Sequence, residues 1–475
     1  MDFLNLLAAS WLQFMVHDWL SHGSGMPGQE IRIPLESHDR WAARTAGDEM
    51  LVRRSKPSTA ATAPPGVPVF DNTETHWWDG SQIYGSTPAR QARLREGAGG
   101  RLTMGADGLL PLDERAGVDL TGVNGNWWLG LALMHTIFAR EHNRICDMLA
   151  AAHPDWDDDR LFETARRVNA AVMAKIHTVE WTPAVVPHKT VARAMHGNWY
   201  GLLGPGIGRM LRRVTRNDVL TGILGSRCDD NGVPFSLTEE FVAVYRMHPL
   251  LPDTLALRNG AGWEPFAMTD VTGPAARALM QSRSLADLIA SLGHIRPGKL
   301  ALHNYPDTLR DLHRPTAGVG SERRIDLAAV DVVRDRERGI PRYNDFRRML
   351  RLEPVGSFTD LTGGDADLGC EIEAVYGDME RVDLMIGLYA EPLLPGFGFS
   401  ETAFRIFILM ASRRLKADPY FTDDFRPEVY SAEGMQWIAD ATMSGVIART
   451  VPELAGALAG VDNPFAPWGP EPNFN

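Results

Sequence analysis

The stretch Leu237–Asp253, LTEEFVAVYRMHPLLPD, decides how the rest of the chain is interpreted. Ser236 and Glu239 form an S-x-x-E capping box ahead of an apolar run, which predicts that a helix begins here. Pro249 disfavours helical geometry at the residue before it, so the helix is expected to end at about His248.

Tyr245 and His248 are three residues apart, so the predicted helix would carry both on one face. A histidine fixed at a helix end can be an axial metal ligand, with a phenol one turn away beside whatever is bound. Taken alone, the same pattern is also typical of ordinary core and surface residues. The remaining sequence decides between these interpretations.

The composition of the 475 residues, with 44% hydrophobic and 23% charged side chains, is typical of a soluble globular protein with a large core. A net charge of −12 argues against a nucleic-acid partner, and it means that an anionic substrate needs locally placed Arg or His. Only Cys146, Cys228 and Cys370 are present, without a C-x-x-C pair. A disulfide framework is therefore not expected, and a reducing, cytoplasmic compartment fits.

Residues 1–20 are apolar, but Gln13, His17 and Asp18 interrupt them and no basic segment precedes them. Neither a signal peptide nor a membrane span is expected, whereas association with a membrane surface stays open. Asp2–Leu20 is predicted to be a helix with Gln13 and His17 on one face, and with Asp18 turned about 100° away from His17. This pair offers a general acid/base beside an amide, although a buried core histidine is the alternative.

Helical patterns continue through most of the chain. They cover 127–188, 274–293, 327–350 with a break at Gly339–Pro341, and a long helix capped by Ser400. Strand signals are few. The predicted fold is mainly α, in one large domain spanning residues 1–475.

The loop THWWDGSQIYGS places Thr75, Trp77, Asp79 and Ser81 at alternate positions, a spacing that can wrap oxygen ligands around a hard cation. An exposed polar turn is the plainer alternative. The absence of H-E-x-x-H and of a Cys/His cluster argues against zinc. Hydrolase, dinucleotide-binding and NTPase motifs are also missing.

Five blocks together resemble the animal haem peroxidase (peroxidase–cyclooxygenase) superfamily. They are QFMVHDW (13–19), WWDGSQIYGS (77–86), FAREHNR (138–144), YRMHPLLPD (245–253) and RDRERGIPRYNDFRR (334–348). The resemblance implies a helical domain with haem b between two central helices. His17 would be the distal histidine with Gln13 beside it, and His248 the proximal iron ligand.

The resemblance also implies a structural calcium ion that ties the distal helix to the loop. Its ligands would be Asp18, Thr75, Trp77 through its carbonyl, Asp79 and Ser81.

Two positions bear on how the haem would be held. Val16 stands where mammalian members carry an acidic residue ester-linked to haem, so the haem is expected to be noncovalent. Asp331 stands where they place an asparagine against the proximal histidine, and a contact with His248 would give the imidazole anionic character. Salt bridges or haem propionates are the expected partners of the charged residues in the third and fifth blocks, namely Arg140, Glu141, Arg334 and Arg336.

Tyr245 stands three residues before the predicted proximal histidine, and in this the sequence resembles the cyclooxygenase and fatty-acid dioxygenase branch of the superfamily, where a tyrosine at that position forms a tyrosyl radical. KIHTVEWT (175–182) and ILMASRRLKADPYF (408–421) resemble the fatty-acid α-dioxygenases. In that family the positions of His177, Thr182 and an arginine of the Arg413–Arg414 pair are implicated in binding the substrate carboxylate. Arg414 is favoured of the two.

The resemblance therefore implies an oxidoreductase that is activated by hydrogen peroxide, removes hydrogen from C2 of a fatty acid through Tyr245 and adds O2, giving a 2-hydroperoxy fatty acid. The first alternative is a haem peroxidase that oxidises small phenols or halides, with Tyr245 uninvolved. A haem sensor or storage protein is the non-enzymatic alternative, which would not need Gln13 and His17. Chain length of the substrate, stereochemistry and oligomeric state do not follow from the sequence.

Overall fold

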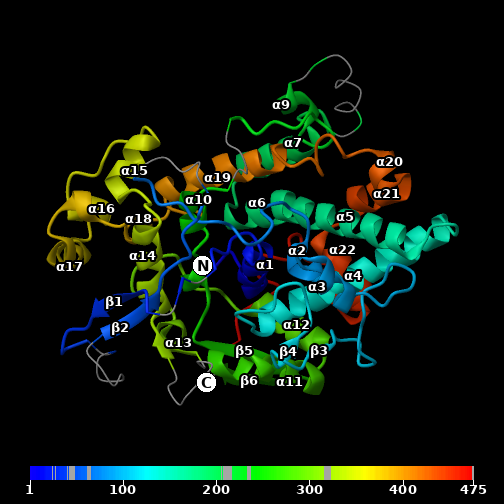
Figure 1. Cartoon of the computed structure of the whole chain (residues 1–475), viewed down its shortest axis with the longest axis horizontal. Coiled ribbons are helices and arrows are strands. Elements are labelled where there is room, and N and C mark those ends of the chain that lie inside the picture. Colours follow the sequence, from blue (N-terminus) through cyan, green and yellow to red (C-terminus); the bar gives the residue numbers. More distant parts are fainter. Residues whose placement is uncertain are drawn as a thin grey trace.

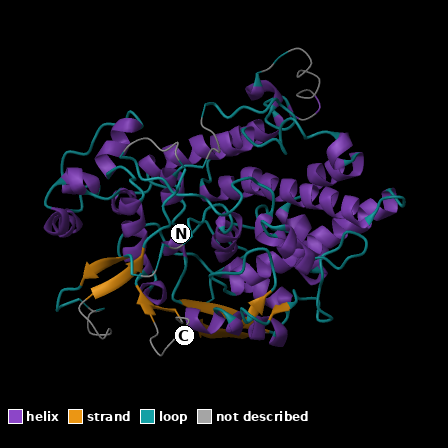
Figure 2. Cartoon of the chain, in the orientation of Figure 1, coloured by secondary structure: helices purple, strands orange, loops and turns teal. Residues whose placement is uncertain are grey.

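The computed structural model describes residues 1–475 except 24, 27, 40, 42–48, 61–65, 205, 207–214, 216, 233–236, 261, 315–322 and 473–475. Helices dominate it, and the strands lie near one edge of the molecule (Figures 1 and 2). This architecture confirms the predicted mainly α class. That the whole chain forms one domain stays a prediction.

The helices of the first half of the described chain are α1 (Leu6–Val16), α2 (Ser81–Tyr84), α3 (Pro88–Leu94), α4 (Leu129–Ala152), α5 (Asp158–Ile176), α6 (Thr182–Val185), α7 (Lys189–Tyr200), α9 (Asp218–Thr221) and α10 (Glu239–Val244). Two irregular turns matter for the site: the π-helix η2 (His177–Trp181) and the 3-10 helix η3 (His248–Leu250).

The helices of the second half are α11 (Pro274–Ser282), α12 (Leu285–His294), α13 (Asp307–Arg310), α14 (Leu327–Glu337), α15 (Tyr343–Met349), α16 (Phe358–Leu361), α17 (Ala366–Tyr376), α18 (Leu384–Ala390), α19 (Glu401–Lys416), α20 (Pro427–Tyr430), α21 (Ala432–Asp440), α22 (Met443–Thr450) and α23 (Ala455–Leu458), with the 3-10 helices η4 (Met268–Val271), η5 (Met379–Arg381) and η6 (Pro452–Leu454).

The strands among the described residues pair only as antiparallel hairpins. They are β1 (Glu30–Pro34) with β2 (Glu49–Arg53), β3 (Leu112–Asp113) with β4 (Val118–Asp119), β5 (Thr254–Asn259) with β6 (Gly262–Ala267), and β7 (Leu312–Arg314) with β8 (Arg323–Ile325). The longest register pairs Thr254 with Ala267 and Asn259 with Gly262.

Helix α1 is surrounded by the core and packs against α4 and α12. Asn5 begins it by accepting a hydrogen bond from the Ala8 amide (3.3 Å). Trp11 and Phe14 are fully buried, with ring centroids 5.3 and 5.4 Å from that of Phe138 on α4. The helix is therefore shorter than the predicted Asp2–Leu20, and His17 caps its carboxyl end. Its position is determined by packing on nearly every side.

The prediction that one helix carries both Tyr245 and His248 is wrong. Helix α10 ends at Val244, Tyr245 is its C-cap, and His248 begins the separate turn η3. Pro249 restricts only the residue before it and does not account for this earlier end, because the backbone has already left helical geometry at Tyr245. Thr238 caps the helix by accepting from the Phe241 amide (3.3 Å), whereas Ser236 of the expected capping box lies outside the described residues.

Other sequence predictions are met more closely. The pattern over 327–350 gives α14 and α15, separated at Gly339–Pro341. Ser400 occupies the N-cap position of α19, but its hydroxyl makes no capping hydrogen bond with the described residues. The pattern over 274–293 gives two helices, α11 and α12. Within the described part of the chain, no helix is both long and apolar enough to cross a membrane.

Candidate active site

Gln13 and His17 lie on the last turns of α1, and both contact the loop leading into α4. Trp128 Nε1 donates to Gln13 Oε1 (2.7 Å), and Gln13 Nε2 donates to Asn126 O (3.3 Å). His17 Nε2 lies 2.8 Å from Gly125 O. Burial lowers the pKa of His17 to about 4, so the imidazole is neutral at pH 7. The structure thus brings together the predicted acid/base and its amide.

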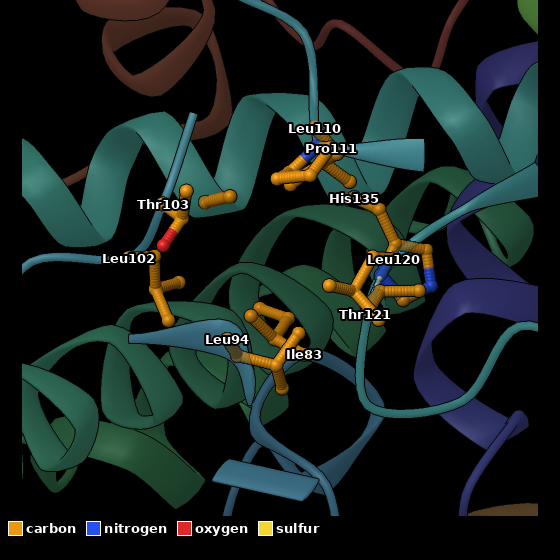
Figure 3. A pocket seen from close by; sticks show the side chains of 10 residues that line it. Ile83, Leu94, Leu102, Thr103, Leu110, Pro111, Leu120, Thr121 and His135 are labelled. Atoms are coloured by element: carbon orange, nitrogen blue, oxygen red, sulfur yellow. Dashed lines mark hydrogen bonds between the residues drawn. The ribbon is translucent and has the colours of Figure 1, made fainter. Parts of the chain in front are cut away.

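A small cavity adjoins His135, whose ring centroid lies 6.2 Å from that of His17 (Figure 3). Thr121 Oγ1 is 2.8 Å from His135 Nδ1 at one side of it. The remaining lining is mostly apolar: Ile83, Leu94, Leu102, Leu110, Pro111, Leu120 and Ala139, with Thr103. The cavity of about 10 Å³ has room for roughly one water molecule, so it is not a site for a fatty-acid chain.

Asp18 leaves the end of α1 and meets the loop 75–81. Its Oδ2 accepts hydrogen bonds from the Ser81 hydroxyl and from the Gln82 amide (2.8 Å). Thr75 Oγ1 lies 2.9 Å from Asp79 Oδ1 and 3.1 Å from Ser81 Oγ. Four of the five residues predicted to bind a cation are therefore in mutual contact, and Trp77 belongs to the same loop.

One carboxylate oxygen of the same cluster is available to a cation. Asp18 Oδ1 is buried and has no hydrogen-bond partner among the described residues. Burial raises the pKa of Asp18 to about 7, since the hydroxyl and amide donors only partly offset desolvation. On the other side of the cluster, Arg166 already pairs with Asp79 (Nη2–Oδ2 3.1 Å). No group of three His, Cys, Asp or Glu in the described chain could hold a metal on its own, so hydroxyl and carbonyl oxygens would have to complete the set.

His248 is fixed from behind by a buried carboxylate on α14. Its Nδ1 lies 2.8 Å from Asp331 Oδ2, which also accepts from the Tyr305 hydroxyl (3.0 Å). Arg246 pairs with the other oxygen of Asp331. Burial alone would raise the pKa of Asp331, but His248 and Arg246 lower it to about 2. The carboxylate is therefore ionised and lies within ion-pair distance of Nδ1, which leaves Nε2 as the ring nitrogen for a metal.

The charged residues of the third and fifth blocks serve the architecture. Arg140 donates to the carbonyls of Gly108 and Thr450, and Glu141 accepts from Trp437 and Arg449. Arg336 forms a two-pronged ion pair with Asp383. Arg334 pairs with Glu337 and donates to the Arg53 carbonyl (2.5 Å). A haem-propionate contact of Arg334 stays a prediction.

The indole rings of Trp19 and Trp78 contact the residues predicted to bind and oxidise the substrate. Trp19 and Trp78 lie 5.4 Å apart, and the Arg414 guanidinium is 3.7 Å from the first ring and 5.6 Å from the second. Tyr245 packs against Trp19 (5.5 Å), and His177 packs against Trp78 (5.3 Å). Side chains from α19, from the C-cap of α10 and from η2 therefore meet on one aromatic frame, here called the indole frame (Trp19 and Trp78).

The polar atoms on this frame are buried and incompletely paired. The Tyr245 hydroxyl, His177 Nε2 and Arg414 Nη1 have no hydrogen-bond partner among the described residues. Arg414 Nη2 donates to the His76 carbonyl (2.6 Å), and burial lowers the pKa of Arg414 to about 10. Burial raises the pKa of Tyr245 above its ordinary value, and the nearby Arg414 opposes that shift. Unpaired buried donors cost free energy, which favours a bound anion here.

The tautomer of His177 follows from its neighbours. Trp11 Nε1 donates to His177 Nδ1 (3.2 Å), and an indole N–H is a donor only. Burial, helped by the charge of Arg414, lowers the pKa of His177 to about 3, so the ring is neutral. Nδ1 is then the acceptor and Nε2 carries the proton. His177 therefore presents a buried N–H that lacks an acceptor.

The π-helix η2 gives His177 this orientation. Its wider turn begins at His177, whose ring stacks on that of Trp181 (4.5 Å). The Thr182 hydroxyl donates to the His177 carbonyl (2.8 Å), and this hydrogen bond joins the two ends of the π-helical turn. Short π-helices inside longer helices are often found at functional sites.

Arg413 and Arg414, the two candidates for binding the substrate carboxylate, differ in burial and in contacts. Arg414 is 3% exposed and lies on the indole frame, whereas Arg413 is half-buried and makes none of these contacts. Only Arg414 brings its charge near Tyr245 and His177.

The chain was compared with known proteins. The model of the animal haem peroxidase family matches residues 2–459. The chain belongs to the animal haem peroxidase family. Within that family it is 39% identical to alpha-dioxygenase 2 of Arabidopsis thaliana over 99% of this chain and 76% of the relative. It is 40% identical to alpha-dioxygenase PIOX of Oryza sativa subsp. japonica over 98% of this chain and 76% of that relative.

Solved structures give the same relationship. The crystal structure of the Oryza sativa fatty acid alpha-dioxygenase has a TM-score of 0.89 and 39% identity, covering 98% of this peroxidase-family chain and 77% of that one. Peroxidase A of Dictyostelium discoideum, at a TM-score of 0.73 and 21% identity, shares the fold alone. The resemblance to fatty-acid α-dioxygenases and the assignment as an oxidoreductase are both confirmed.

Membership of a haem peroxidase family implies haem, and the residues present fit it. His248 has its Nδ1 against Asp331 and leaves Nε2 for an iron. His17, the predicted distal histidine, is neutral, and its Nδ1 is buried without a partner among the described residues. These two histidines are those predicted from the motifs.

Some residues of the site were not found by motif analysis. Trp11, Trp19 and Trp78 orient His177, Arg414 and Tyr245. Trp19 and Trp78 lie inside the quoted blocks QFMVHDW and WWDGSQIYGS, which is the one available signal for them. Arg246, one partner of Asp331, likewise lies inside the quoted block YRMHPLLPD, whereas Tyr305, the other partner, lies outside all five blocks.

Proposed function

We propose that this chain is a haem-dependent fatty-acid α-dioxygenase, which converts a fatty acid and O2 into a 2-hydroperoxy fatty acid. The supporting observation is the set of three buried, unpaired polar atoms on the indole frame: the Tyr245 hydroxyl, His177 Nε2 and Arg414 Nη1. A solved structure of a tyrosine-to-phenylalanine variant of the Oryza sativa enzyme carries palmitic acid and is 39% identical to this chain.

The substrate carboxylate is proposed to bind between Arg414 and His177. One oxygen accepts from Arg414 Nη1 in a charge-assisted hydrogen bond, and the other accepts from the protonated Nε2 of His177. Thr182 is proposed to serve this site by holding the turn that carries His177, because its hydroxyl already donates to the His177 carbonyl. The apolar chain would extend along the aromatic core around Phe407, whose ring lies 5.8 Å from that of Tyr245.

With the carboxylate held in this way, C2 is the carbon nearest the Tyr245 oxygen. Placing that carbon within about 3–3.5 Å selects the position of attack by geometry. Bound haem, after reaction with hydrogen peroxide, supplies the one-electron oxidation that turns Tyr245 into a phenoxyl radical. The phenoxyl oxygen takes a hydrogen atom from C2, O2 adds to the carbon radical, and the peroxyl radical recovers the hydrogen atom from Tyr245. The tyrosyl radical is thereby regenerated.

His17 and Gln13 are proposed to serve the peroxide. The neutral His17 ring can accept a proton from hydrogen peroxide and return it, and Gln13 orients the small molecule by its amide. His248 would hold the iron. Val16 is half-buried and offers no carboxylate for an ester bond, which supports noncovalent haem.

A calcium ion is proposed at the end of α1. Asp18, Thr75, Asp79 and Ser81 would supply side-chain oxygens and Trp77 its carbonyl. The unpaired Oδ1 of buried Asp18 supports the assignment, because a cation would satisfy it. The ion would fix the loop that carries Trp78 to the helix that carries His17.

Oxygen uptake with palmitic and lauric acids, followed by mass spectrometry of the product, tests this function. Wild type is expected to consume O2 and form the 2-hydroperoxide after priming with hydrogen peroxide. Tyr245→Phe should abolish O2 uptake and retain guaiacol oxidation by peroxide. If the wild-type protein oxidises guaiacol but takes up no O2 with either acid, the chain is a peroxidase instead.

A further inference from the structure

The outer side of α7 carries a stripe of basic residues. Lys189, Arg193 and His196 are exposed and are spaced four and three residues apart, so they lie along one line of the helix. Neither Lys189 nor Arg193 forms an ion pair with any residue that the structure describes. The chain as a whole carries a net charge of −12. An unpaired basic stripe therefore runs against the overall charge of the protein.

An apolar tip follows directly at the end of this helix. Leu202, Leu203 and Val219 are 59%, 50% and 62% exposed. The Leu202 amide donates to the Val219 carbonyl (3.0 Å), so the segments after α7 and in α9 lie side by side. Other strongly exposed large apolar residues, such as Met349 and Val375, lie on separate elements far along the chain. Single exposed apolar residues are ordinary, whereas a contiguous group marks an interaction surface.

The inner side of α7 packs against the elements that carry the carboxylate site. It contacts η2 and α6, which contain His177 and Thr182. Asn198 Nδ2 donates to Ser412 Oγ on α19 (3.3 Å), two residues before Arg414. In Figure 1, α7 and α9 lie together above α19 and α6 at the upper edge of the molecule. The basic stripe and the apolar tip, together called the α7 face, therefore lie one helix away from the proposed substrate carboxylate.

We infer that the α7 face docks on the surface of an anionic phospholipid bilayer, from which the enzyme takes its fatty acid. The inference rests on the proposed function, which supplies an amphipathic substrate that resides in membranes. A basic stripe beside exposed leucines is the arrangement by which peripheral proteins lie in a lipid interface. The stripe would meet lipid headgroups, and Leu202, Leu203 and Val219 would enter the headgroup–acyl boundary.

The net negative charge of the chain favours binding to an anionic bilayer through the α7 face. Because the net charge of the chain is negative, a basic stripe without ion pairs among the described residues would help to orient the molecule as it approaches an anionic bilayer. Each cation near such a surface changes partitioning on the order of fivefold, and the effect fades as salt shortens the Debye length. Docking in this orientation would bring the substrate to the side of the molecule where His177 and Arg414 bind its carboxylate.

Flotation with phosphatidylcholine vesicles, with and without phosphatidylglycerol, tests the inference on haem-loaded protein. Wild type should float with the anionic vesicles and stay soluble with the neutral ones. Lys189→Gln with Arg193→Gln should reduce flotation on the order of tenfold or more and remove its salt dependence. Leu202→Ser with Leu203→Ser and Val219→Ser should lower flotation at all salt concentrations. The matched controls, Arg115→Gln with Arg381→Gln and Met349→Ser with Val375→Ser, change equally exposed residues elsewhere and should behave as wild type.

Oxygen uptake separates this inference from the function on which it rests. With lauric acid dispersed in detergent, all variants should match wild type, whereas uptake with palmitic acid in anionic vesicles should fall in the α7-face variants alone. Equal flotation of all variants, or no flotation of wild type while detergent activity persists, would overturn the α7 face and leave the dioxygenase intact. Failure of wild type to take up O2 in detergent would instead overturn the proposed function.

Discussion

The guanidinium of Arg414 lies over the indole ring of Trp19, with Cζ 3.7 Å from the ring centroid. The face of an indole attracts a cation, which offsets part of the cost of burying Arg414 at 3% exposure. The contact leaves Nη1 at the edge of the guanidinium unpaired. Arg414 thus keeps a donor for an anion and forms no ion pair with a carboxylate in the part of the chain that the structure describes.

Arg414→Gln should lower kcat/KM for palmitic acid on the order of 10- to 100-fold, because a charge-assisted contact to the carboxylate is lost. Most of the change is expected in KM, with guaiacol oxidation unaffected. The matched control is Arg413→Gln, which removes a half-buried arginine from the next position of the same helix. Steady-state oxygen uptake over a range of palmitic acid concentrations measures both. Equal losses in the two variants would mean that Arg414 does not bind the carboxylate.

Asp331→Asn should make the haem iron easier to reduce. The ionised Asp331 lies 2.8 Å from His248 Nδ1 and gives the imidazole anionic character, which stabilises the ferric state. Spectroelectrochemical titration of the purified haem protein should therefore show a more positive midpoint potential. Tyr305→Phe removes one donor from the same carboxylate and should shift the potential in the opposite direction, since the carboxylate becomes a stronger acceptor. An unchanged potential in Asp331→Asn at full haem content would contradict this role.

Removal of calcium should destabilise the protein. A ligand that binds only the folded state at about 100 times its Kd contributes roughly 2.7 kcal/mol, so EGTA is expected to lower the thermal midpoint and added Ca²⁺ to restore it. Asp18→Asn should remove the response to EGTA. Glu74→Gln, in the segment just before the loop, changes a carboxylate that accepts from Ser86 and should keep the response. A wild-type midpoint that is indifferent to EGTA would argue against the ion.

The helices could be predicted where one apolar face repeats, and less well where packing decides their ends. The patterns of α4, α5, α14 and α15 are visible in the sequence, as is the break at Gly339–Pro341. The end of α10 was placed too late, because Tyr245 turns toward Trp19 and Phe407 while His248 turns toward Asp331. Those two directions depend on partners that are remote in the chain, and a local pattern does not contain them.

The site divides in the same way. The motifs predict the roles of Gln13, His17 and His248, and these roles stay predictions; Gln13 and His17 contact Trp128 and Gly125, respectively, at the loop leading into α4. The indole frame could not be derived in advance, because Trp19, Trp78 and Arg414 are brought together only by tertiary packing. The choice of Arg414 over Arg413 depended on this packing, since adjacent residues of a helix differ by about 100° in direction.

Glu180 should make the protein less stable as the pH rises. Glu180 lies in the π-helix η2 and accepts from the Met443 amide with both carboxylate oxygens (3.1 Å each). The nearby Lys175 is not hydrogen-bonded to Glu180, because it donates to the carbonyls of Ile438, Ala439 and Ala441. Burial raises the pKa of Glu180 from 4.5 to about 7, against the opposing effects of the Met443 amide and Lys175.

Between these two values of pKa the folded state holds a proton that the unfolded chain has released, so the contribution of Glu180 to stability is lost as the pH rises. Glu180→Gln keeps an acceptor and removes the charge. It should therefore match wild type at about pH 4.5 and be more stable by on the order of 2 kcal/mol at about pH 8. Thermal unfolding midpoints across this range measure the difference. Glu428→Gln, at a side chain 75% exposed, should stay parallel to wild type, and a Glu180→Gln curve that does the same would show that the carboxyl is ionised in the folded protein at low pH.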